Sequence, residues 1–487
     1  MEKERLLKSL DFGQVDAESE NNLTDLFVKT REFERVPDSD TQLIKGAKGS
    51  GKSAIFKLFT EHEDYAREKL PNKFPENLSI IKATGGESFK TVLGEDLKNL
   101  VEEDGFDYDK FWRLYISLKI ASQIGSEGYS ATDELGTVLQ KLGEQPDHRV
   151  LPFGKRMWQA FIGSPPTNGN ISIKDLTINF EHESDIDIRQ LLLQEQEFLE
   201  ERNKQVWLLF DQIDELQSQH PEKRKEMLEA LFRTQLSFMR DPFSNIHLKV
   251  LIRSDIWKDL SFVNMDKFLG KQINLGWNSG ILIKLINKRM LSSPEVKEYV
   301  SDTISKDLDA DIVDQYDIET QKRIFYAVFA DQVYSGPKEA DLFDWIRDRI
   351  KDGLDGHYPR ELISFCNVAK ENQIKENPNP NKKLIEGNSV KDAYYTVSEQ
   401  RVNTYLGEFG EIEEHVNSFE GMRQKEFTRD ELSELFEDLS PYGDEAITKL
   451  YELGVLKPKD GRGRNADKFE IPPLYRDGLG LVLRGRP

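Results

Sequence analysis

Residues 46–53 read GAKGSGKS and match the pattern G-x-x-x-x-G-K-[ST], a glycine-rich turn that binds phosphate groups. The preceding residues 41–45, TQLIK, have the composition of a short strand. Residues 53–59, SAIFKLF, have the apolar spacing of a helix. The motif requires a strand, a turn and a helix in this order. Its flanks therefore favour a phosphate-binding loop over a chance glycine-rich turn with an exposed lysine.

Each part of this motif has its own role in phosphate binding. Glycines let successive backbone N–H groups point inward around phosphate oxygens, and the start of the helix adds a partial positive charge. We expect Lys52 to reach the β- and γ-phosphates and the Ser53 hydroxyl to help hold Mg²⁺. The predicted nucleotide-binding residues are Gly46, Ala47, Lys48, Gly49, Ser50, Gly51, Lys52 and Ser53.

A second motif lies in residues 205–216, QVWLLFDQIDEL. An apolar run that ends in Asp211 predicts a buried parallel strand whose last residue lies at the carboxyl edge of the sheet, where open α/β sheets bind ligands. We therefore expect Asp211 to meet Mg²⁺, directly or through water, opposite Ser53. Asp214 and Glu215 follow, and either carboxylate is a candidate for orienting or deprotonating the attacking water. The alternative is that both only begin the next helix.

Three further apolar runs complete the predicted sheet. They are LSIIKATG at 78–85, HLKVLIRSD at 247–255 and QINLGW at 272–277. The second run ends in Arg253 and Ser254, which either contact the γ-phosphate or the catalytic water, or only cap the strand. Strands that alternate with helices predict an α/β fold, a three-layer sandwich with a parallel sheet. With the motif at residues 46–53, the expected fold is a P-loop NTPase sandwich.

The same pattern outlines three domains. We expect a P-loop ATPase domain at 1–277, with a mostly helical insertion at about 105–200. Helical spacing dominates 278–420 and predicts a helical lid followed by a linker helix. Residues 421–487 contain two short helical patterns, then VLKP, a glycine-rich tip and KFEIP, which together predict a C-terminal winged-helix domain.

Composition limits the class of protein. The chain has 487 residues and a formal net charge of −21, which argues against nucleic-acid binding over its whole surface. Its single cysteine, Cys366, excludes an internal disulfide and is typical of a reducing cytoplasm. No apolar run approaches the roughly 20 residues of a membrane span, and the N-terminal segment is too charged for a signal peptide. We therefore expect a cytoplasmic protein that does not enter the membrane.

Along the chain, the motifs follow in a fixed order: the phosphate loop, LLFDQIDEL, LIRSD, PREL and a terminal winged helix. This order resembles that of STAND-type ATPases. This AAA+-related branch includes origin-recognition-type and NACHT-type NTPases. The chain is particularly similar to bacterial P-loop ATPases that begin with a segment like LDFGQVDAESE and end with one like FEIPPLYRDGLGL. The resemblance covers essentially the whole chain and implies ATP and Mg²⁺ as ligands.

The resemblance also implies roles for residues at strand and helix ends. It makes Asp211 the metal-side aspartate and puts Arg253 or Ser254 in the position of a first sensor. Arg360, which follows Pro359 at a predicted helix start, takes the position of the lid arginine that touches the γ-phosphate. Together with the two motifs, these form the predicted catalytic set of Lys52, Asp211, Asp214, Glu215, Arg253, Ser254 and Arg360.

Two features depart from ring-forming AAA+ motors. Gln212 follows Asp211 where such motors usually have glutamate. Where they carry an arginine finger, between Ser254 and Gln272, this chain offers only lysines: Lys258, Lys267 and Lys271. Lysine is a poorer planar clamp for a transferring phosphoryl group. Both departures favour a slow nucleotide switch over a rapid hexameric motor.

Four functions compete. The first is an ATP-hydrolysing regulatory switch that forms a homo-oligomer or acts on an effector protein, as in a bacterial anti-phage defence or signalling assembly. The second is a DNA-binding, origin-recognition-like ATPase whose winged-helix tip offers basic residues to phosphates: Lys457, Lys459, Arg462, Arg464 and Lys468. The helix that would enter the major groove is acidic, which favours packing of the winged helix on the ATPase core instead.

The other two functions have less support. A GTPase or small-molecule kinase is disfavoured because the chain lacks an Asn-Lys-x-Asp guanine-reading signature. A protein that binds ATP only as a structural element is disfavoured because every phosphate and metal position is intact.

Overall fold

The computed structural model describes residues 2–84, 108–124, 170–173, 176–179, 188–213, 221–240, 242–376, 382–408 and 410–482. The chain forms two compact units. We call Glu32–Gly46 with Lys52–Leu275 the sheet unit, and Met1–Arg31, Ala47–Gly51 and Gly276–Pro487 the helical unit. Each unit is built around its own hydrophobic core.

The sheet unit contains five parallel strands in the order β2-β5-β6-β1-β7. Their bounds are β1 Leu43–Gly46, β2 Leu78–Thr84, β5 Gln205–Asp211, β6 Ile246–Arg253 and β7 Gln272–Asn274. The central strands are runs of buried residues, as expected for a parallel sheet covered on both faces. The predicted parallel sheet is therefore confirmed, although the run at 272–277 forms a shorter strand than its composition indicates.

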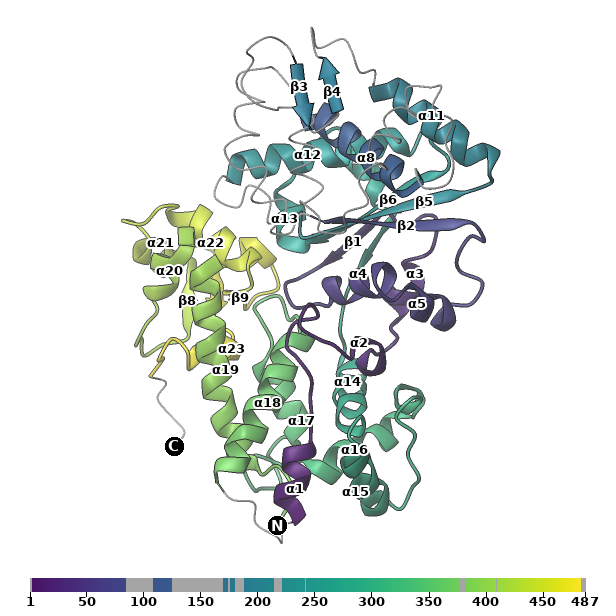
Figure 1. Ribbon diagram of the computed structural model, residues 1–487. Coiled ribbons are helices and arrows are strands. Elements are labelled where there is room, and N and C mark those ends of the chain that lie inside the picture. Colours follow the sequence, from purple (N-terminus) through teal and green to yellow (C-terminus); the bar gives the residue numbers. More distant parts are fainter. Residues whose placement is uncertain are drawn as a thin grey trace. The chain divides into compact units, whose positions relative to one another are not determined.

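Helices cover both faces of this sheet (Figure 1). On one face, Leu208 and Phe210 of β5 pack with Trp112, whose indole Nε1 donates a 2.8 Å hydrogen bond to the Met227 carbonyl. On the other face, α4 packs on β1, β2, β5 and β6. The first layer is α8 Tyr108–Ile124, α11 Ile188–Glu201, α12 Pro221–Phe238 and α13 Ser254–Asp259, and the second is α3 Arg31–Arg35, α4 Lys52–Thr60 and α5 Glu63–Lys69. This confirms the predicted three-layer arrangement.

The predicted insertion is described in three pieces. Helices α8 and α11 lie in this stretch of the chain. In the same stretch, β3 Asn170–Ile173 and β4 Leu176–Asn179 pair as antiparallel strands. The 3-10 helix η3 Met265–Phe268 precedes β7 in the same unit.

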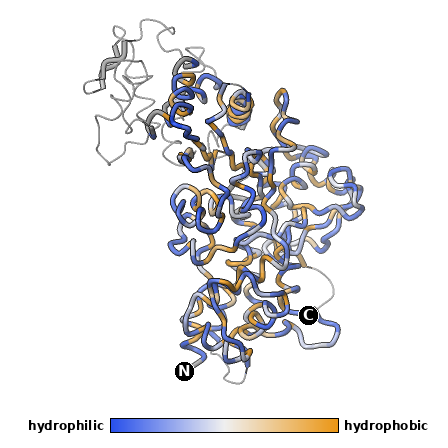
Figure 2. Tube along the Cα trace, turned by 90° about the vertical axis from the view of Figure 1, so that its right-hand side faces the viewer, coloured by the Kyte–Doolittle hydropathy of each residue, from blue (hydrophilic) through white to orange (hydrophobic). Residues whose placement is uncertain are grey.

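Helices make up most of the helical unit. Among the described helices before residue 409, three begin at residues whose side chains accept a backbone hydrogen bond, namely Asn278, Ser293 and Asp317. Figure 2 shows hydrophobic and hydrophilic residues interspersed along the trace, and a helix with both kinds can bury one face and expose the other. The elements before residue 409 are α1 Glu2–Ser9, α2 Leu23–Leu26, α14 Ser279–Leu291, α15 Pro294–Ile304, η4 Val313–Gln315, α16 Ile318–Val328, α17 Leu342–Arg349, α18 Pro359–Lys375 and α19 Gly387–Glu408.

The end of the helical unit combines short helices with a three-stranded antiparallel sheet, ordered β8-β10-β9. Thr428 and Glu431 form a reciprocal capping box that begins α21. Its elements are η5 Gly410–Ile412, α20 Glu413–Asn417, β8 Glu426–Thr428, α21 Arg429–Leu435, α22 Gly443–Glu452, β9 Lys457–Pro458, η6 Gly463–Asn465, β10 Lys468–Glu470 and α23 Pro473–Arg476. Within the described ranges, no helix combines the length and apolar character needed to cross a bilayer.

Candidate functional site

The predicted phosphate loop contains two glycines with left-handed backbone conformations. Strand β1 ends at Gly46 and α4 begins at Lys52, so the motif forms the turn between them. Gly49 and Gly51 have φ values of +78° and +93°, which side chains with a Cβ rarely adopt. The Ser50 N–H donates a 3.2 Å hydrogen bond to the Ala47 carbonyl and tightens the turn.

The loop residues 47–51 pack against two side chains of the helical unit. The Trp277 indole Nε1 donates a 2.9 Å hydrogen bond to the Ser50 carbonyl. A Cβ atom added at Gly49 would lie 2.9 Å from the Cβ of Arg360, so no larger residue fits there without movement. Arg360 is the second residue of α18, where the sequence predicts a helix start. The structure thus places Arg360, the predicted lid arginine, next to Gly49 of the predicted phosphate loop.

Lys52 and Ser53 are the first two residues of α4. The Lys52 ammonium donates a 2.9 Å hydrogen bond to the Gly46 carbonyl, and so folds back on the first residue of its own motif. Lys48 lies in the turn and is partly buried. All eight residues of the predicted loop lie in the part of the chain that the structure describes.

The carboxyl edge of the sheet carries the predicted strand-end residues. Asp211 is the last residue of β5 and only 4% exposed. Arg253 is the last residue of β6, and Ser254 begins α13. Strand β6 lies between β5 and β1. Arg253 at the end of β6 therefore pairs in register with Gly46 of β1, and β5, which ends in Asp211, is the neighbour on the opposite side of β6.

Arg253 forms an ion pair that the motifs do not include. Its Nη2 lies 2.7 Å from the Asp255 carboxylate. Burial alone raises the pKa of Asp255, but the Arg253 guanidinium, helped by Lys52, outweighs burial and holds that pKa below its usual value. Asp255 and Trp277 are the two site residues that sequence reasoning missed. The only signal for Asp255 was its position two residues after a strand-end arginine.

Asp214 and Glu215, the predicted acidic pair, lie outside the described residues. Gln212, between Asp211 and this pair, has a φ of +57°, a left-handed conformation that is uncommon for a residue with a Cβ. Such conformations concentrate at functional sites, where the surrounding structure maintains them. The chain thus turns sharply as it leaves β5 at Asp211.

The oxygen ligands of Ser53 and Asp211 suit Mg²⁺ chemically. Hydroxyl and carboxylate oxygens are hard ligands, and Mg²⁺ usually takes only one or two from the protein, with the rest from substrate phosphates and water. Asp211 ends a strand on which α4, the helix of Ser53, packs directly. Among the residues for which positions are given, no cluster of three or more His, Cys, Asp or Glu side chains could hold a metal without such help.

The basic residues predicted to contact nucleic acid are largely paired with carboxylates. Lys457 lies 2.6 Å from Asp355, and Lys459 lies 3.1 Å from Glu426. Arg462 pairs with Asp460 and Asp467 in the same way. Arg464 and Lys468 complete the predicted set. These pairs reduce the positive potential that this tip offers to a phosphate backbone.

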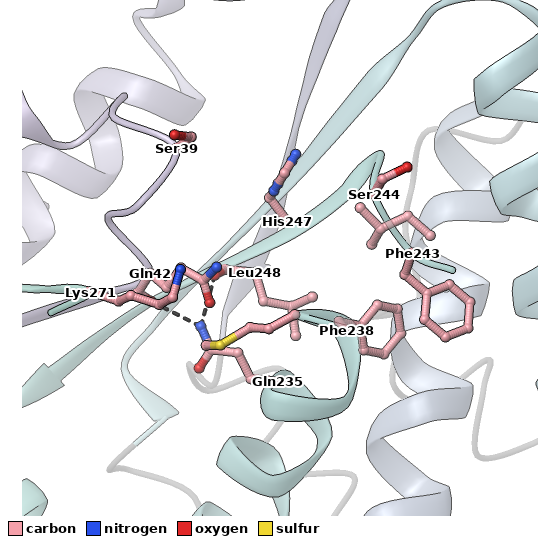
Figure 3. Close-up of a pocket in the computed structure, with 11 residues that line it drawn as sticks. Ser39, Gln42, Gln235, Phe238, Phe243, Ser244, His247, Leu248 and Lys271 are labelled. Atoms are coloured by element: carbon pink, nitrogen blue, oxygen red, sulfur yellow. Dashed lines mark hydrogen bonds between the residues drawn. The ribbon is translucent and has the colours of Figure 1, made fainter. Parts of the chain in front are cut away.

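A separate pocket of about 210 Å³ lies at the opposite, amino-terminal edge of the sheet (Figure 3). The Gln235 side-chain amide donates hydrogen bonds to the Gln42 and Leu248 carbonyls at its base. Aromatic rings of Phe238 and Phe243 form one side. Because this pocket begins where β1 and β6 start, it is not part of the carboxyl-edge site.

Comparisons with known proteins give distant matches. No family model matches the chain. An 80.3 kDa protein of Escherichia coli (strain K12), named for transposon gamma-delta, is 23% identical over 523 residues, which cover 97% of this chain and 67% of that protein.

Solved structures give matches of low TM-score. Cdc6p from Pyrobaculum aerophilum has a TM-score of 0.32 and 11% identity, covering 91% of this chain and 87% of its own. ORC2 from Aeropyrum pernix, solved as ADPNP–ADP complexes, has a TM-score of 0.36 and 11% identity, covering 91% and 88%. ORC1 from Aeropyrum pernix, in complex with DNA, has a TM-score of 0.31 and 12% identity, covering 94% and 96%. At these values, the likenesses establish neither the fold nor the function of this chain.

Proposed function

We propose that the protein binds ATP with Mg²⁺ at residues 46–53 and hydrolyses it. The single observation that carries this proposal is the phosphate loop itself: a complete motif, with left-handed glycines, that joins a central parallel strand to a helix. The turn lies between β1 and α4 at the carboxyl edge of a parallel sheet, which is where α/β proteins bind their ligands. This position favours a phosphate-binding loop over a chance glycine-rich turn.

Each predicted residue has a chemical task in this reaction. Loop N–H groups and Lys52 bind the phosphates, and Ser53 and Asp211 hold Mg²⁺. Asp214 or Glu215 accepts a proton from the water that attacks the γ-phosphorus. The bond from that phosphorus to the bridging oxygen breaks, and ADP and phosphate leave. Arg253 and Arg360 offset negative charge on the γ-phosphate.

We further propose that hydrolysis is slow and serves a switch. Gln212 replaces the acidic residue of rapid motors, and lysines stand where those motors carry an arginine finger. Support for the switch comes from Arg360, which lies so near Gly49 that a Cβ added there would be 2.9 Å from the Arg360 Cβ, and which belongs to the long helix α18. If Arg360 contacts ATP but not ADP, the bound nucleotide changes which position of α18 is favoured. A switch of this kind requires such an element with two positions. We place this switch in the cytoplasm, in a homo-oligomer or with an effector protein.

The test is a phosphate-release assay on the full chain with ATP and with GTP. We expect magnesium-dependent release from ATP that Asp211→Asn reduces by about 10² or more. Absence of ATP hydrolysis in the wild type, with ATP still bound, would leave a binding protein rather than an enzyme. Native mass measurement with ATP, ADP and no nucleotide tests the switch, because a nucleotide-dependent change in assembly size is expected.

The alternative is a DNA-binding ATPase that acts through a winged helix at residues 421–487. The strand order β8-β10-β9 with α21 and α22 supports such a domain. The ion pairs of Lys457, Lys459 and Arg462 weigh against DNA binding by its tip. Titration of duplex DNA at two salt concentrations separates these readings, because phosphate contacts give an affinity that falls steeply with salt. Loss of that affinity on changing Arg462 and Arg464 to alanine would favour the alternative.

A further inference from the structure

We propose that Asp255 is a positioning residue that holds the Arg253 guanidinium beside the phosphate loop, so that Arg253 distinguishes a bound triphosphate from a diphosphate. This inference rests on the proposed nucleotide site and adds to it a residue that neither motif contains. Its first support is strand register. Arg253 ends β6 directly beside Gly46, the residue at which β1 enters the loop.

The second support is the geometry of the pair. Arg253 Nε donates to Asp255 Oδ1 at 3.2 Å, and Arg253 Nη2 donates to Oδ2 at 2.7 Å. Two parallel hydrogen bonds fix the plane of a guanidinium as well as its position. Both side chains are less than one-fifth exposed, at 17% and 18%. A pair this enclosed loses less to solvent screening than a surface pair.

The third support is the charge around Lys52. The Lys52 ammonium donates to the Gly46 carbonyl, and its charge adds to that of Arg253 in lowering the pKa of Asp255. The two cations Arg253 and Lys52 and the Asp255 carboxylate therefore act on one another at the carboxyl edge of the sheet. Without the carboxylate, Arg253 and Lys52 repel each other, and Arg253 regains rotamers that lead away from the loop. The negative charge of Asp255 thus keeps Arg253 where a γ-phosphate would meet it.

The test compares nucleotide affinities of Asp255→Asn, Arg253→Gln and the double variant in the full chain. Asparagine keeps the shape of aspartate but removes its charge. Isothermal titration with Mg²⁺ gives the Kd of ATPγS and of ADP for each protein, and thermal unfolding reports folding. The matched control is Asp259→Asn, at the other end of the same short helix.

We expect the wild type to prefer ATPγS over ADP, and Asp255→Asn to reduce this preference about tenfold through loss of one charge-assisted pair. The Kd for ADP should change by less than about threefold, because ADP lacks the phosphate that Arg253 meets. The double variant should match Arg253→Gln alone, since Asp255 acts only through Arg253. Asp255→Glu, which restores the charge, should recover part of the preference.

Two results would overturn the inference and leave the proposed function standing. One is an unchanged preference in Asp255→Asn. The other is an effect of Asp255→Asn that persists in full when Arg253 is already glutamine. Failure of the wild type to bind either nucleotide would instead refute the proposed function itself. If Asp255→Asn does not fold, Arg253→Gln and Asp255→Glu still decide whether the pair controls the preference.

Discussion

The side-chain ammonium of Lys249 donates a 2.8 Å hydrogen bond to the carbonyl oxygen of Thr41, two residues before β1 begins. It also donates to the carbonyls of Val36 and Asp38, at 2.9 and 3.0 Å, and lies 4.4 Å from the centroid of the Trp207 ring. A buried ammonium is unfavourable unless its donors are satisfied. Here they are satisfied by the segment that leads into the phosphate loop.

Replacing Lys249 with methionine should destabilise the protein by about 2–4 kcal/mol, because three carbonyls lose their donor. Methionine has a similar length, so the change removes the charge and the donors without leaving a large cavity. Denaturant unfolding measures the effect. Lys267→Met, at an exposed lysine, is the control and should stay within about 0.5 kcal/mol. Equal effects in the two variants would show that Lys249 does not fix this segment.

His247, which lines the pocket of Figure 3, should make stability depend on pH. Burial, with a smaller contribution from Lys249, lowers the pKa of His247 from 6.5 to about 4. At pH values between these two pKa values, His247 binds a proton in the unfolded chain but not in the folded chain. Stability from this group therefore rises as pH increases from about 4 to 6.5, and is lost as pH falls.

The variant His247→Asn cannot take up this proton. Its unfolding free energy should depend less steeply on pH than that of the wild type between about 4 and 6.5. Denaturant unfolding at several pH values within this window measures the difference. Identical slopes would mean that His247 titrates normally in the folded protein.

The N-terminal segment is fixed by a buried ion pair within the helical unit. Arg289 Nη1 lies 3.2 Å from Glu20 Oε2, and both side chains are at most 7% exposed. The same nitrogen donates to the Phe12 carbonyl, and Phe12 itself is fully buried against Phe329. Gly13 leaves room for this pair, because an added Cβ would lie 2.1 Å from Arg289 Nη1.

Glu20→Gln should therefore cost about 3–5 kcal/mol, because it leaves the Arg289 charge buried without its partner. Hydrogen exchange should show faster exchange in residues 10–20 than in the rest of the helical unit. The exposed Glu18→Gln is the control. Loss of stability without a change in exchange at 10–20 would contradict a role in fixing this segment.

The base of the proposed reaction can be assigned by two matched substitutions. Glu215→Gln should retain ATP and slow turnover by about 10² or more if Glu215 accepts the proton. Asp214→Asn should then be the milder change. Single-turnover phosphate release compares the two, and a reversed order would move the role to Asp214.

Much of the sheet could be predicted because its strands are contiguous apolar runs that end in polar residues. The run before Asp211 and the run before Arg253 each place a charged side chain at the carboxyl edge. The phosphate loop could be predicted because its glycines and Lys52 satisfy geometric needs that few other sequences meet.

Other features depend on tertiary contacts that the local sequence does not contain. Trp277 looks like the end of a strand, but β7 stops at Asn274 and the indole binds the loop carbonyl of Ser50. Strand β8, only three residues long, exists because it pairs with β10. In the sequence, Asp255 is an ordinary residue of a helix start, and only the structure shows its two hydrogen bonds with Arg253.

The measurement that tests the central claim most directly is a titration of the full chain with ATPγS and Mg²⁺, compared with Lys52→Ala and with Lys57→Ala on the same helix. We predict one saturable site per chain in the wild type and in Lys57→Ala, and no measurable binding in Lys52→Ala. Binding of equal affinity to all three proteins would contradict the assignment of residues 46–53 as the nucleotide site.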